Sequence, residues 1–534
     1  MPDMQPAAPQ GGTPPKRNAF TRFLDTVEWL GNLLPHPVTL FFLLALSMVL
    51  LSGVFGYLGV AVDDPRPVGA AGRSEDGMIR AVSLLSADGV RRIFSGLVTN
   101  FTSFAPLGVV LTAMLGIGVA EKSGVLSAAV RGMVLGASKN VVTVVIVFAG
   151  VMSNTASELG YVVLIPLAGA VYYSLGRHPL AGMAAAFAGV SGGYSANLLI
   201  GTIDPLLAGI TEEAARLIDP TYSVTATANY YFMAISVFMV TLVGWAVSTY
   251  IVEPKLGAYN KEDADPTVLE GATADPLTRQ EKKGLKWAGL AFLGVLALMA
   301  ITILPSWGVL RDPVTGDAMR SPFFSGFAVW ILIFFLAIGW AYGRVVGTVK
   351  NDRDVIDGMA QAMTSLGLYL VIIFFAAQFV AFFNWSNIGS ITAVKGAQGL
   401  QALGLTGPVI FIGFILICCF VNLMIGSASA QWAMTAPIFV PMLMLLGYSP
   451  ELIQAAYRIG DSTTNIITPM MSYFGLILAW AVRYDKKVGI GTMIAMMLPY
   501  SIFFTIIWTI MFFVWVFGFG LPVGPGAPTY YSLG

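Results

Sequence analysis

Long apolar segments recur along the whole of this sequence, and no other feature constrains its fold as strongly. Residues 38–60 and 322–342, for example, contain no charged side chain. An apolar helix of about 18 or more residues is long enough to cross the hydrocarbon core of a bilayer. Only 11% of the 534 residues are charged, whereas soluble domains carry about 25%. With so many such segments the membrane is the solvent of the fold, and the sequence predicts an all-α polytopic membrane protein.

Composition also argues against several kinds of partner. The formal net charge is zero, so nothing favours binding to nucleic acid. The N-terminal end is rich in Pro, Gly and Gln and lacks the apolar core of a cleaved signal peptide. We expect residues 1–35 to be disordered or interfacial. Cys418 and Cys419 are adjacent and no metal-ligand spacing surrounds them, so no resident cofactor is predicted.

The Lys and Arg content of short loops assigns each segment to a side of the membrane. Basic residues place the N-terminus and the loop 253–286 in the cytoplasm. The C-terminus then lies in the periplasm, and the protein is expected in a bacterial inner membrane. The loop 62–92 must lie outside although it contains several Arg residues, and we expect a small folded element there. The nine predicted spans are 38–60, 104–120, 180–208, 230–252, 287–304, 322–342, 359–382, 450–480 and 489–517.

Two further apolar stretches are interrupted. Residues 141–176 break at Ser153–Glu158, and residues 406–447 break at Gly426–Ser429. The part before the first break is too short to cross about 30 Å of hydrocarbon. Both stretches therefore predict re-entrant hairpins, which by the order of the spans enter from opposite sides. Non-helical backbone at that depth is tolerated only where it lines protein or a wet cavity.

The span after each hairpin is interrupted as well, which indicates an inverted repeat. Asn197 precedes Pro205 by eight residues, as Asp461 precedes Pro469. Interrupted segments in corresponding positions of two inverted halves point to the central site of a secondary transporter. The predicted organisation is a scaffold at 36–140 and 230–382, transport repeats at 141–208 and 406–480, and a last span with the C-terminus at 489–534.

Ionisable side chains inside spans are rare and mark a transport pathway. Asp461 is a candidate ligand for a cation or proton, and Arg458 a docking point for an anionic substrate, although the two could instead pair with each other. Asp204 could titrate or ligate an ion, or merely cap a helix. Glu158, just past the first hairpin tip, could be a structural acceptor.

Uncharged candidates accompany them. An indole beside a cavity can stack on an aromatic substrate, so Trp432 is a candidate contact, with simple packing as the alternative. The amides in apolar surroundings could be carbonyl ligands of an ion or ties between helices; they are Asn154, Asn197, Asn422 and Asn465.

Several long motifs resemble those of one family. Ser-Asn-Thr-Ala-Ser-Glu-Leu-Gly-Tyr at 153–161, Gly-Gly-Tyr-Ser-Ala-Asn-Leu at 192–198, Gly-Thr-Ile-Asp-Pro at 201–205, Gly-Ser-Ala-Ser-Ala-Gln-Trp at 426–432 and Tyr-Arg-Ile-Gly-Asp-Ser at 457–462 are similar to the AbgT family of aminobenzoyl-glutamate transporters. The resemblance covers nearly the whole chain. It implies a bowl-shaped homodimer in the lipid bilayer, with an inner transport domain and an outer dimerisation domain.

The resemblance also implies a function and a set of site residues. It implies transport of p-aminobenzoyl-glutamate and export of sulfonamides, with sulfonamide resistance as the consequence. The substrate residues that it implies are Asp204, Ser429, Trp432, Arg458, Asp461 and Pro469. The sodium ligands that it implies are Asn422, Gly426 and Asp461.

Direction, coupling ion and two other function classes stay open at this point. Export needs antiport, whereas import of p-aminobenzoyl-glutamate needs symport, and either a proton or sodium could drive the exchange. A passive channel is a remote alternative. Gly189–Gly193 fits the G-x-S-x-G pattern of hydrolases, but both histidines precede its Ser, so we do not expect an enzyme.

Overall fold

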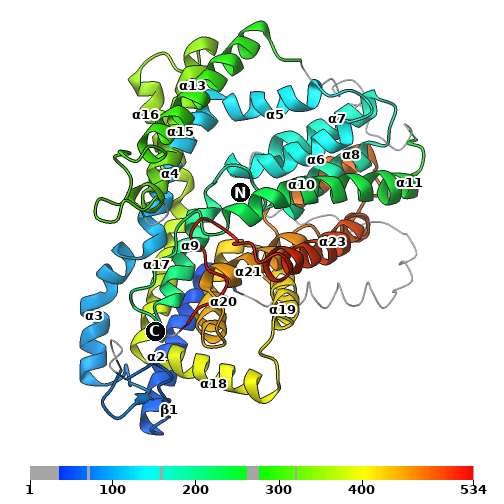
Figure 1. Cartoon of the computed structure of the whole chain (residues 1–534). Helices are drawn as coiled ribbons and strands as arrows, with labels where there is room; N and C mark the ends of the chain where they lie inside the picture. Colours follow the sequence, from blue (N-terminus) through cyan, green and yellow to red (C-terminus); the bar gives the residue numbers. More distant parts are fainter. Residues whose placement is uncertain (1–34, 69–72, 157–159, 261–275, 319–320, 533–534) are drawn as a thin grey trace, which may run out of the picture.

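The computed structural model describes residues 35–68, 73–156, 160–260, 276–318 and 321–532, and this part of the chain is mostly helical (Figure 1). Seven of its helices or continuous helical runs are long and apolar enough to cross a membrane. They are α2 (Pro37–Tyr57), α3 with α4 (Ala87–Thr102 and Ala105–Ser123), α10 with η4 and α11 (Tyr230–Val247, Ser248–Val252 and Glu253–Leu256), α13 (Arg279–Ile303), α15 (Phe327–Val346), α17 (Gly367–Trp385) and α23 with η6 (Ile490–Phe513 and Val514–Gly518).

These seven runs correspond to seven of the predicted spans, but three of them begin well away from the predicted start. The second run begins at Ala87 and not at 104, α13 begins at Arg279 and not at 287, and α17 begins at Gly367 and not at 359. The predicted outer loop 62–92 ends early, because α3 begins at Ala87. Ser86 caps this helix by accepting a hydrogen bond from the Gly89 amide at 3.0 Å, and a Ser at this position stabilises a helix start. The polar side chains of α3 hid the helix from a search for apolar segments.

The two stretches predicted to be interrupted are interrupted at the expected places. In the first, α6 (Val142–Ser153) ends in a short 3-10 turn, η1 (Asn154–Ala156), and helix resumes with η2 (Gly160–Leu164) and α7 (Ile165–Ser174). Glu158 lies outside the described residues. In the second, α19 (Ile410–Met424) and α20 (Ala428–Met444) are separated by three non-helical residues.

The two spans that follow these stretches are also broken. Helix α8 (Pro179–Phe187) continues as η3 (Ala188–Gly192), and the chain is then irregular up to α9 (Ile203–Ala215). Likewise, α21 (Pro450–Thr464) is separated from α22 (Phe474–Tyr484) by irregular backbone. The packing repeats too, since α6 contacts α8 and α19 contacts α21, while α9 and α20 join the two halves.

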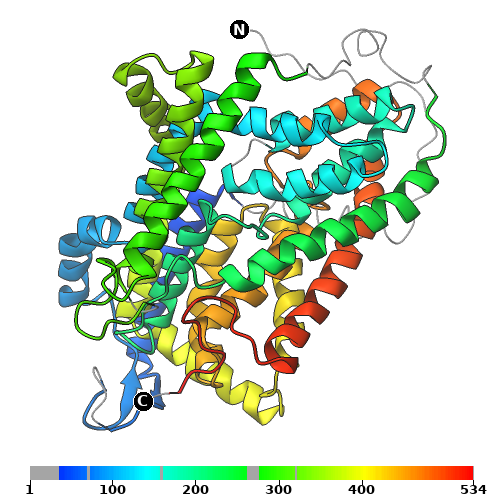
Figure 2. The same ribbon diagram turned by 45° about the horizontal axis from the view of Figure 1, so that its top comes forward.

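The remaining helices form a second group. Helices α4, α13 and α15 pack side by side with α16 (Asp352–Ser365), and α2 packs on α17. Figures 1 and 2 show this group on one side of the molecule and α6, α7 and α8 on the other, with α5 (Val125–Leu135) reaching between them. Helices α5 and α18 (Ile388–Ala402) were not predicted, because each lies in a segment that charge or polarity marked as a loop. Helix α16 begins in such a loop and ends inside the predicted span 359–382, which the structure divides between α16 and α17.

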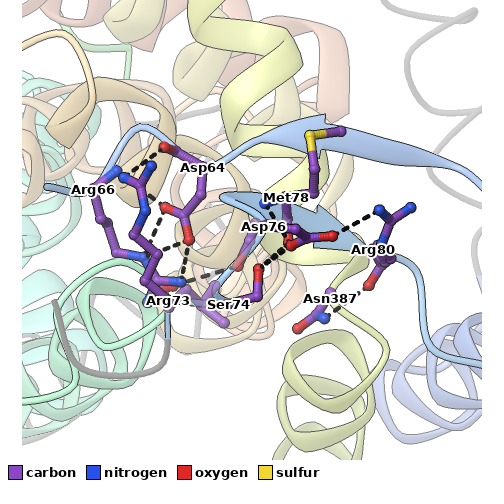
Figure 3. Close-up of polar contacts among 10 residues, drawn as sticks. Asp64, Arg66, Arg73, Ser74, Asp76, Met78, Arg80 and Asn387 are labelled. Atoms are coloured by element: carbon purple, nitrogen blue, oxygen red, sulfur yellow. Dashed lines mark hydrogen bonds and ion pairs between the residues drawn. The ribbon is translucent and has the colours of Figure 1, made fainter. Parts of the chain in front are cut away.

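A small sheet is an exception to the all-α expectation and supplies the folded element predicted in the outer loop. Strands β1 (Ala61–Asp63) and β2 (Met78–Arg80) pair antiparallel, with Val62 opposite Ile79. Arg66 holds the buried Asp64 at 2.6 Å, and Arg80 contacts Asp76 at 2.7 Å (Figure 3). Asn387, just before α18, donates to the Arg80 carbonyl oxygen at 2.8 Å and ties the sheet to the helices.

Candidate functional site

A cavity of about 380 Å³ lies where the broken segments of both repeats meet the second helix group. The first repeat contributes Asn154 and Tyr194, and the second contributes residues 426–429 and 471–473. The opposite wall comes from α4 and α17, through residues such as Met114 and Tyr369. One chamber is therefore walled by two halves of the chain that are more than 200 residues apart.

The walls of this cavity are aromatic and hydroxylated. Tyr161 and Tyr473 stack face to face, with ring centroids 4.7 Å apart and an interplanar angle of 3°. Hydroxyl groups come from Ser427, Ser429 and Ser472. Among the described residues, no charged side chain lines the cavity. The walls therefore suit an aromatic ring flanked by groups that accept hydrogen bonds.

Two helix N-termini border the same cavity. Helix α20 begins at Ala428 and α9 at Ile203, and both residues line the wall. The first amides of a helix carry partial positive charge and lack intrahelical acceptors. Ser427 caps one of them, since its Oγ accepts from the Ala430 amide. The two termini favour an anionic ligand group such as a carboxylate.

Directly behind the wall, Arg458 and Asp204 form a buried ion pair. Arg458 Nη2 lies 2.7 Å from Asp204 Oδ1, and the side chains are only 1% and 5% exposed. Arg458 also donates to the Ser195 carbonyl oxygen at 3.0 Å. The sequence spacing suggested an alternative pairing of Arg458 with Asp461, but the guanidinium instead reaches the other repeat.

Asp204 is held by further donors at the start of α9. Its Oδ2 accepts hydrogen bonds from Asn197 Nδ2 at 3.0 Å and from the Gly201 amide at 2.9 Å. Three donors thus surround this carboxylate, and the charge of Arg458 compensates its own. Asn197 is occupied by this contact, so in the present conformation it orients Asp204.

Asp461 has a different environment. Its side chain is fully buried, and neither carboxylate oxygen has a hydrogen-bond partner within the described part of the chain. Tyr457 is one helical turn earlier, but its hydroxyl donates to the Ala428 carbonyl oxygen at 2.6 Å. A buried carboxylate without donors is costly, so it must take up a proton or lie beside a cation.

Of the residues expected to form a sodium cage with Asp461, Asn422 contacts it and Gly426 contacts another segment. Asn422 Nδ2 donates to the Asp461 backbone oxygen at 2.7 Å, while Asn422 Oδ1 is buried without a partner among the described residues. Gly426 lies against the irregular segment of the other leg, since a Cβ there would come within 2.7 Å of the Met470 backbone. Unpartnered carboxylate and amide oxygens beside non-helical backbone are a suitable donor set for Na⁺.

Of the other predicted substrate residues, one lines the cavity and two do not. Ser429 lines it, whereas Trp432 and Pro469 are not among its lining residues. Trp432 is completely buried, stacks on Tyr457 with centroids 4.2 Å apart, and donates from Nε1 to Thr211 Oγ1 at 2.9 Å. In this conformation its ring forms a support behind the wall.

The structure also shows where Asn154 and the G-x-S-x-G string at 189–193 lie. Asn154 lines the cavity and donates weakly, at 3.4 Å, to the Gly193 carbonyl oxygen. Its Oδ1 has no partner among the described residues, so it can still accept. Ser191 of the G-x-S-x-G string lies in the helical turn η3 and contacts Met471 Sδ at 3.2 Å. This is not the strand-to-helix turn that a hydrolase needs.

Sequence reasoning missed the aromatic wall and a polar network behind it. Tyr161 is the last residue of the motif at 153–161, and Tyr473 follows the interruption of the span 450–480. The available signal for both tyrosines was that each lies close to a helix break. In the network, Thr211 donates to Gln454 Oε1 at 2.6 Å, and Gln454 Nε2 donates to Asn229 Oδ1 at 2.8 Å. Nothing in the sequence pairs these residues, which come from three separate segments.

Comparisons with known proteins agree with these features. The model of the family described as "AbgT putative transporter family" matches residues 22–531. The chain is 35% identical to the p-aminobenzoyl-glutamate transport protein of Escherichia coli K12 over 512 residues, which is 96% of this chain and 98% of that protein.

Two solved structures are similar over almost their whole length. MtrF of Neisseria gonorrhoeae, described as illuminating a class of antimetabolite efflux pumps, is 59% identical with a TM-score of 0.89, covering 95% of this chain and all of MtrF. The YdaH transporter of Alcanivorax borkumensis, described as having an unusual topology, is 47% identical with a TM-score of 0.84, covering 92% of this chain and all of YdaH. The predicted family is confirmed. This chain is a multi-pass membrane protein of the AbgT family, a family of transporters and not of enzymes.

Proposed function

We propose that this protein is an ion-coupled secondary transporter of the bacterial inner membrane, which moves p-aminobenzoyl-glutamate and exports sulfonamide antimetabolites. Sulfonamide resistance would follow from that export. The observation that carries the proposal is the buried carboxylate of Asp461, which has no hydrogen-bond partner in the described part of the chain, together with a cavity walled by both repeats. Such a group exchanges a proton or a cation as its surroundings change, which is what coupling requires.

The topology that we propose has nine spans and two opposed re-entrant hairpins. The seven long helical runs and the two broken spans make nine, and α6–α7 and α19–α20 are the hairpins. Helix α6 has 12 residues, which is about 18 Å and too short for a bilayer core of about 30 Å. The basic loops place the N-terminus in the cytoplasm and the C-terminus in the periplasm.

Residues 141–208 and 406–480 form the moving transport domain in this proposal. The helices that pack against it form the scaffold, which in the family resemblance joins two copies into a homodimer. The cavity lies between the two parts, with α4 and α17 on the scaffold side. Relative movement of the parts would open the cavity to each side of the membrane in turn.

The chemistry of the cavity supports an aromatic carboxylate as substrate. The stacked Tyr161 and Tyr473 offer a flat surface to a benzoyl ring. The N-termini of α9 and α20 can receive carboxylate or sulfonyl oxygens. Ser429 supplies a hydroxyl in the same wall, and Asn154 supplies an amide. Trp432, Arg458, Asp204 and Pro469 remain proposed substrate residues, which would have to act from behind the wall or after a rearrangement.

The coupling site that we propose centres on Asp461. A proton would neutralise the carboxylate directly. Sodium would use Asp461 with the free Oδ1 of Asn422 and the backbone at Gly426, and Asn154 and Asn197 lie in the corresponding part of the first repeat. The proton serves antiport and drug export, whereas sodium symport would make the protein an importer of p-aminobenzoyl-glutamate.

Flux into proteoliposomes tests the proposal. A sodium gradient and a pH gradient would each be imposed alone, with labelled p-aminobenzoyl-glutamate or a labelled sulfonamide as the substrate. We expect the flux to follow one gradient and to disappear in Asp461→Asn. Asp357→Asn is the matched control, because Asp357 is an exposed carboxylate on α16. Flux that ignores both gradients would leave a passive channel as the better description.

A further inference from the structure

A second cavity, of about 300 Å³, lies on the other side of the first hairpin tip. It is bounded by α5, α13 and α15, by Met152 and Ser153 at the end of α6, and by Thr155 in η1. None of its lining residues belongs to the first cavity. Except for the two hydroxyl side chains at the tip, its walls are Ala, Val, Leu, Ile, Met, Phe and Gly. A cavity of this kind takes a hydrocarbon ligand.

The cavity reaches the outer surface of the protein along α13. Gly289 lines it and is exposed, and a Cβ built there would meet no atom within 4 Å. Trp287 and Leu290, beside this glycine, are 51% and 57% exposed. In a multi-pass membrane protein an exposed apolar helix face borders lipid, so acyl chains have direct access to the opening.

Positive charge lies on the same face of α13, one to two turns before the opening. Lys282, Leu285, Lys286 and Gly289 are spaced by three, four and seven residues, which places them on one side of the helix. Both lysines are exposed. Within the described part of the chain, neither ammonium group lies within 4 Å of a carboxylate. These two cations are therefore available to a phosphate at the membrane surface.

We propose that this cavity binds an acyl chain of an anionic phospholipid, whose phosphate is held by Lys282 and Lys286. The apolar walls select the chain, and the two lysines select the negative headgroup. The bound chain would contact both α13 and the tip of the first hairpin. If the hairpin moves during transport, as proposed above, the lipid would then also influence transport, but its binding does not depend on that movement.

The test uses the full-length protein in nanodiscs that contain phosphatidylglycerol with a photoreactive acyl chain. After irradiation and digestion, we expect crosslinks on the cavity-lining residues of α5 and α13. Gly289→Leu should remove them, because the new side chain fills an open part of the cavity. Gly294→Leu is the matched control, because Gly294 is equally open on α13 but does not line the cavity.

The headgroup is tested in the same system. Lys282→Gln and Lys286→Gln should each reduce crosslinking about fivefold at low salt, whereas Lys283→Gln, which points to another side of α13, should have little effect. Photoreactive phosphatidylcholine should label the cavity less than phosphatidylglycerol does. Absence of crosslinks in the cavity, or equal loss in Gly289→Leu and Gly294→Leu, would overturn the proposal. Either result would mean that the cavity does not hold an acyl chain of this lipid.

Discussion

Arg458 on α21 and Asp204 at the start of α9 form an ion pair of 2.7 Å between the two repeats, buried directly behind the central cavity. The two partners compensate each other's charge. Asp461, three residues further along α21, is a buried carboxylate with no donor among the residues that the structure describes. This relationship separates a structural charge pair from a carboxylate that is free to take up an ion.

A double-mutant cycle tests that separation. Removing one partner of a buried pair leaves an uncompensated charge and costs about 3–5 kcal/mol. We expect Asp204→Asn and Arg458→Gln each to lower the unfolding temperature of the purified protein strongly. The decrease in unfolding temperature of the double variant should be clearly smaller than the sum of the two single decreases, because the partners are coupled. Additive losses would show that the pair contributes nothing to stability.

The polar network behind the wall should hold Trp432 in place through Thr211. Thr211→Val removes the acceptor of the indole N–H and the donor to Gln454. Each buried group left without a partner costs about 1–3 kcal/mol. We therefore expect a lower unfolding temperature and weaker substrate binding. Thr211→Ser keeps the hydroxyl and should behave nearly as the unmodified protein does, and equal effects of Val and Ser would contradict the role of the hydrogen bonds.

The stacked tyrosines should contribute to affinity for an aromatic substrate. Tyr473→Ala removes one ring from the pair with Tyr161, and aromatic contacts of this kind are worth about 0.5–1.5 kcal/mol. The concentration for half-maximal flux of p-aminobenzoyl-glutamate should rise about two- to tenfold. Tyr473→Phe preserves the ring and serves as the control. If Phe impairs transport as much as Ala, the hydroxyl and not the aromatic surface is what matters.

The small sheet outside the membrane should loosen in acid. Burial favours the neutral form of Asp64, but hydrogen bonds from Arg66 outweigh it and hold the pKa of the carboxyl below its ordinary value. A carboxyl whose pKa is lowered by folding stabilises the folded state above its unfolded pKa of about 3.9, and this contribution is lost as the pH falls through the lower folded value.

Hydrogen-exchange protection of the two strands, residues 61–63 and 78–80, measures this effect. Protection should be constant near neutral pH and should fall as the pH drops below about 4. Asp64→Asn should reduce protection already at neutral pH, while Asp88→Asn, at an exposed position on α3, should leave it unchanged. Equal protection at neutral pH in Asp64→Asn and the unmodified protein would contradict the role of the Arg66 contact.

The sequence by itself determined where the helices that meet the membrane lie and where they break. Apolar length specifies a span because backbone groups in hydrocarbon must be paired within the helix, and α2, α10 and α23 accordingly begin within one residue of their predicted positions. The breaks at residues 153–158 and 426–429 were readable because polar and small residues interrupt otherwise apolar stretches. Helices α3, α5 and α18 and the first half of α16 were not predicted, because amphipathic or polar helices resemble loops in a search for apolar length.

Only the tertiary structure decided which of the singled-out residues meet. Spacing along one helix made Arg458 and Asp461 neighbours, but long side chains reach across helix contacts, and Arg458 reaches Asp204 from the other repeat. Trp432 packs on Tyr457 and Thr211, while Tyr161 and Tyr473 take the wall of the cavity. The spacing of residues along the sequence indicates which of them share a face of one helix. The partner across a helix contact depends on how distant segments pack, and only the folded chain brings those segments together.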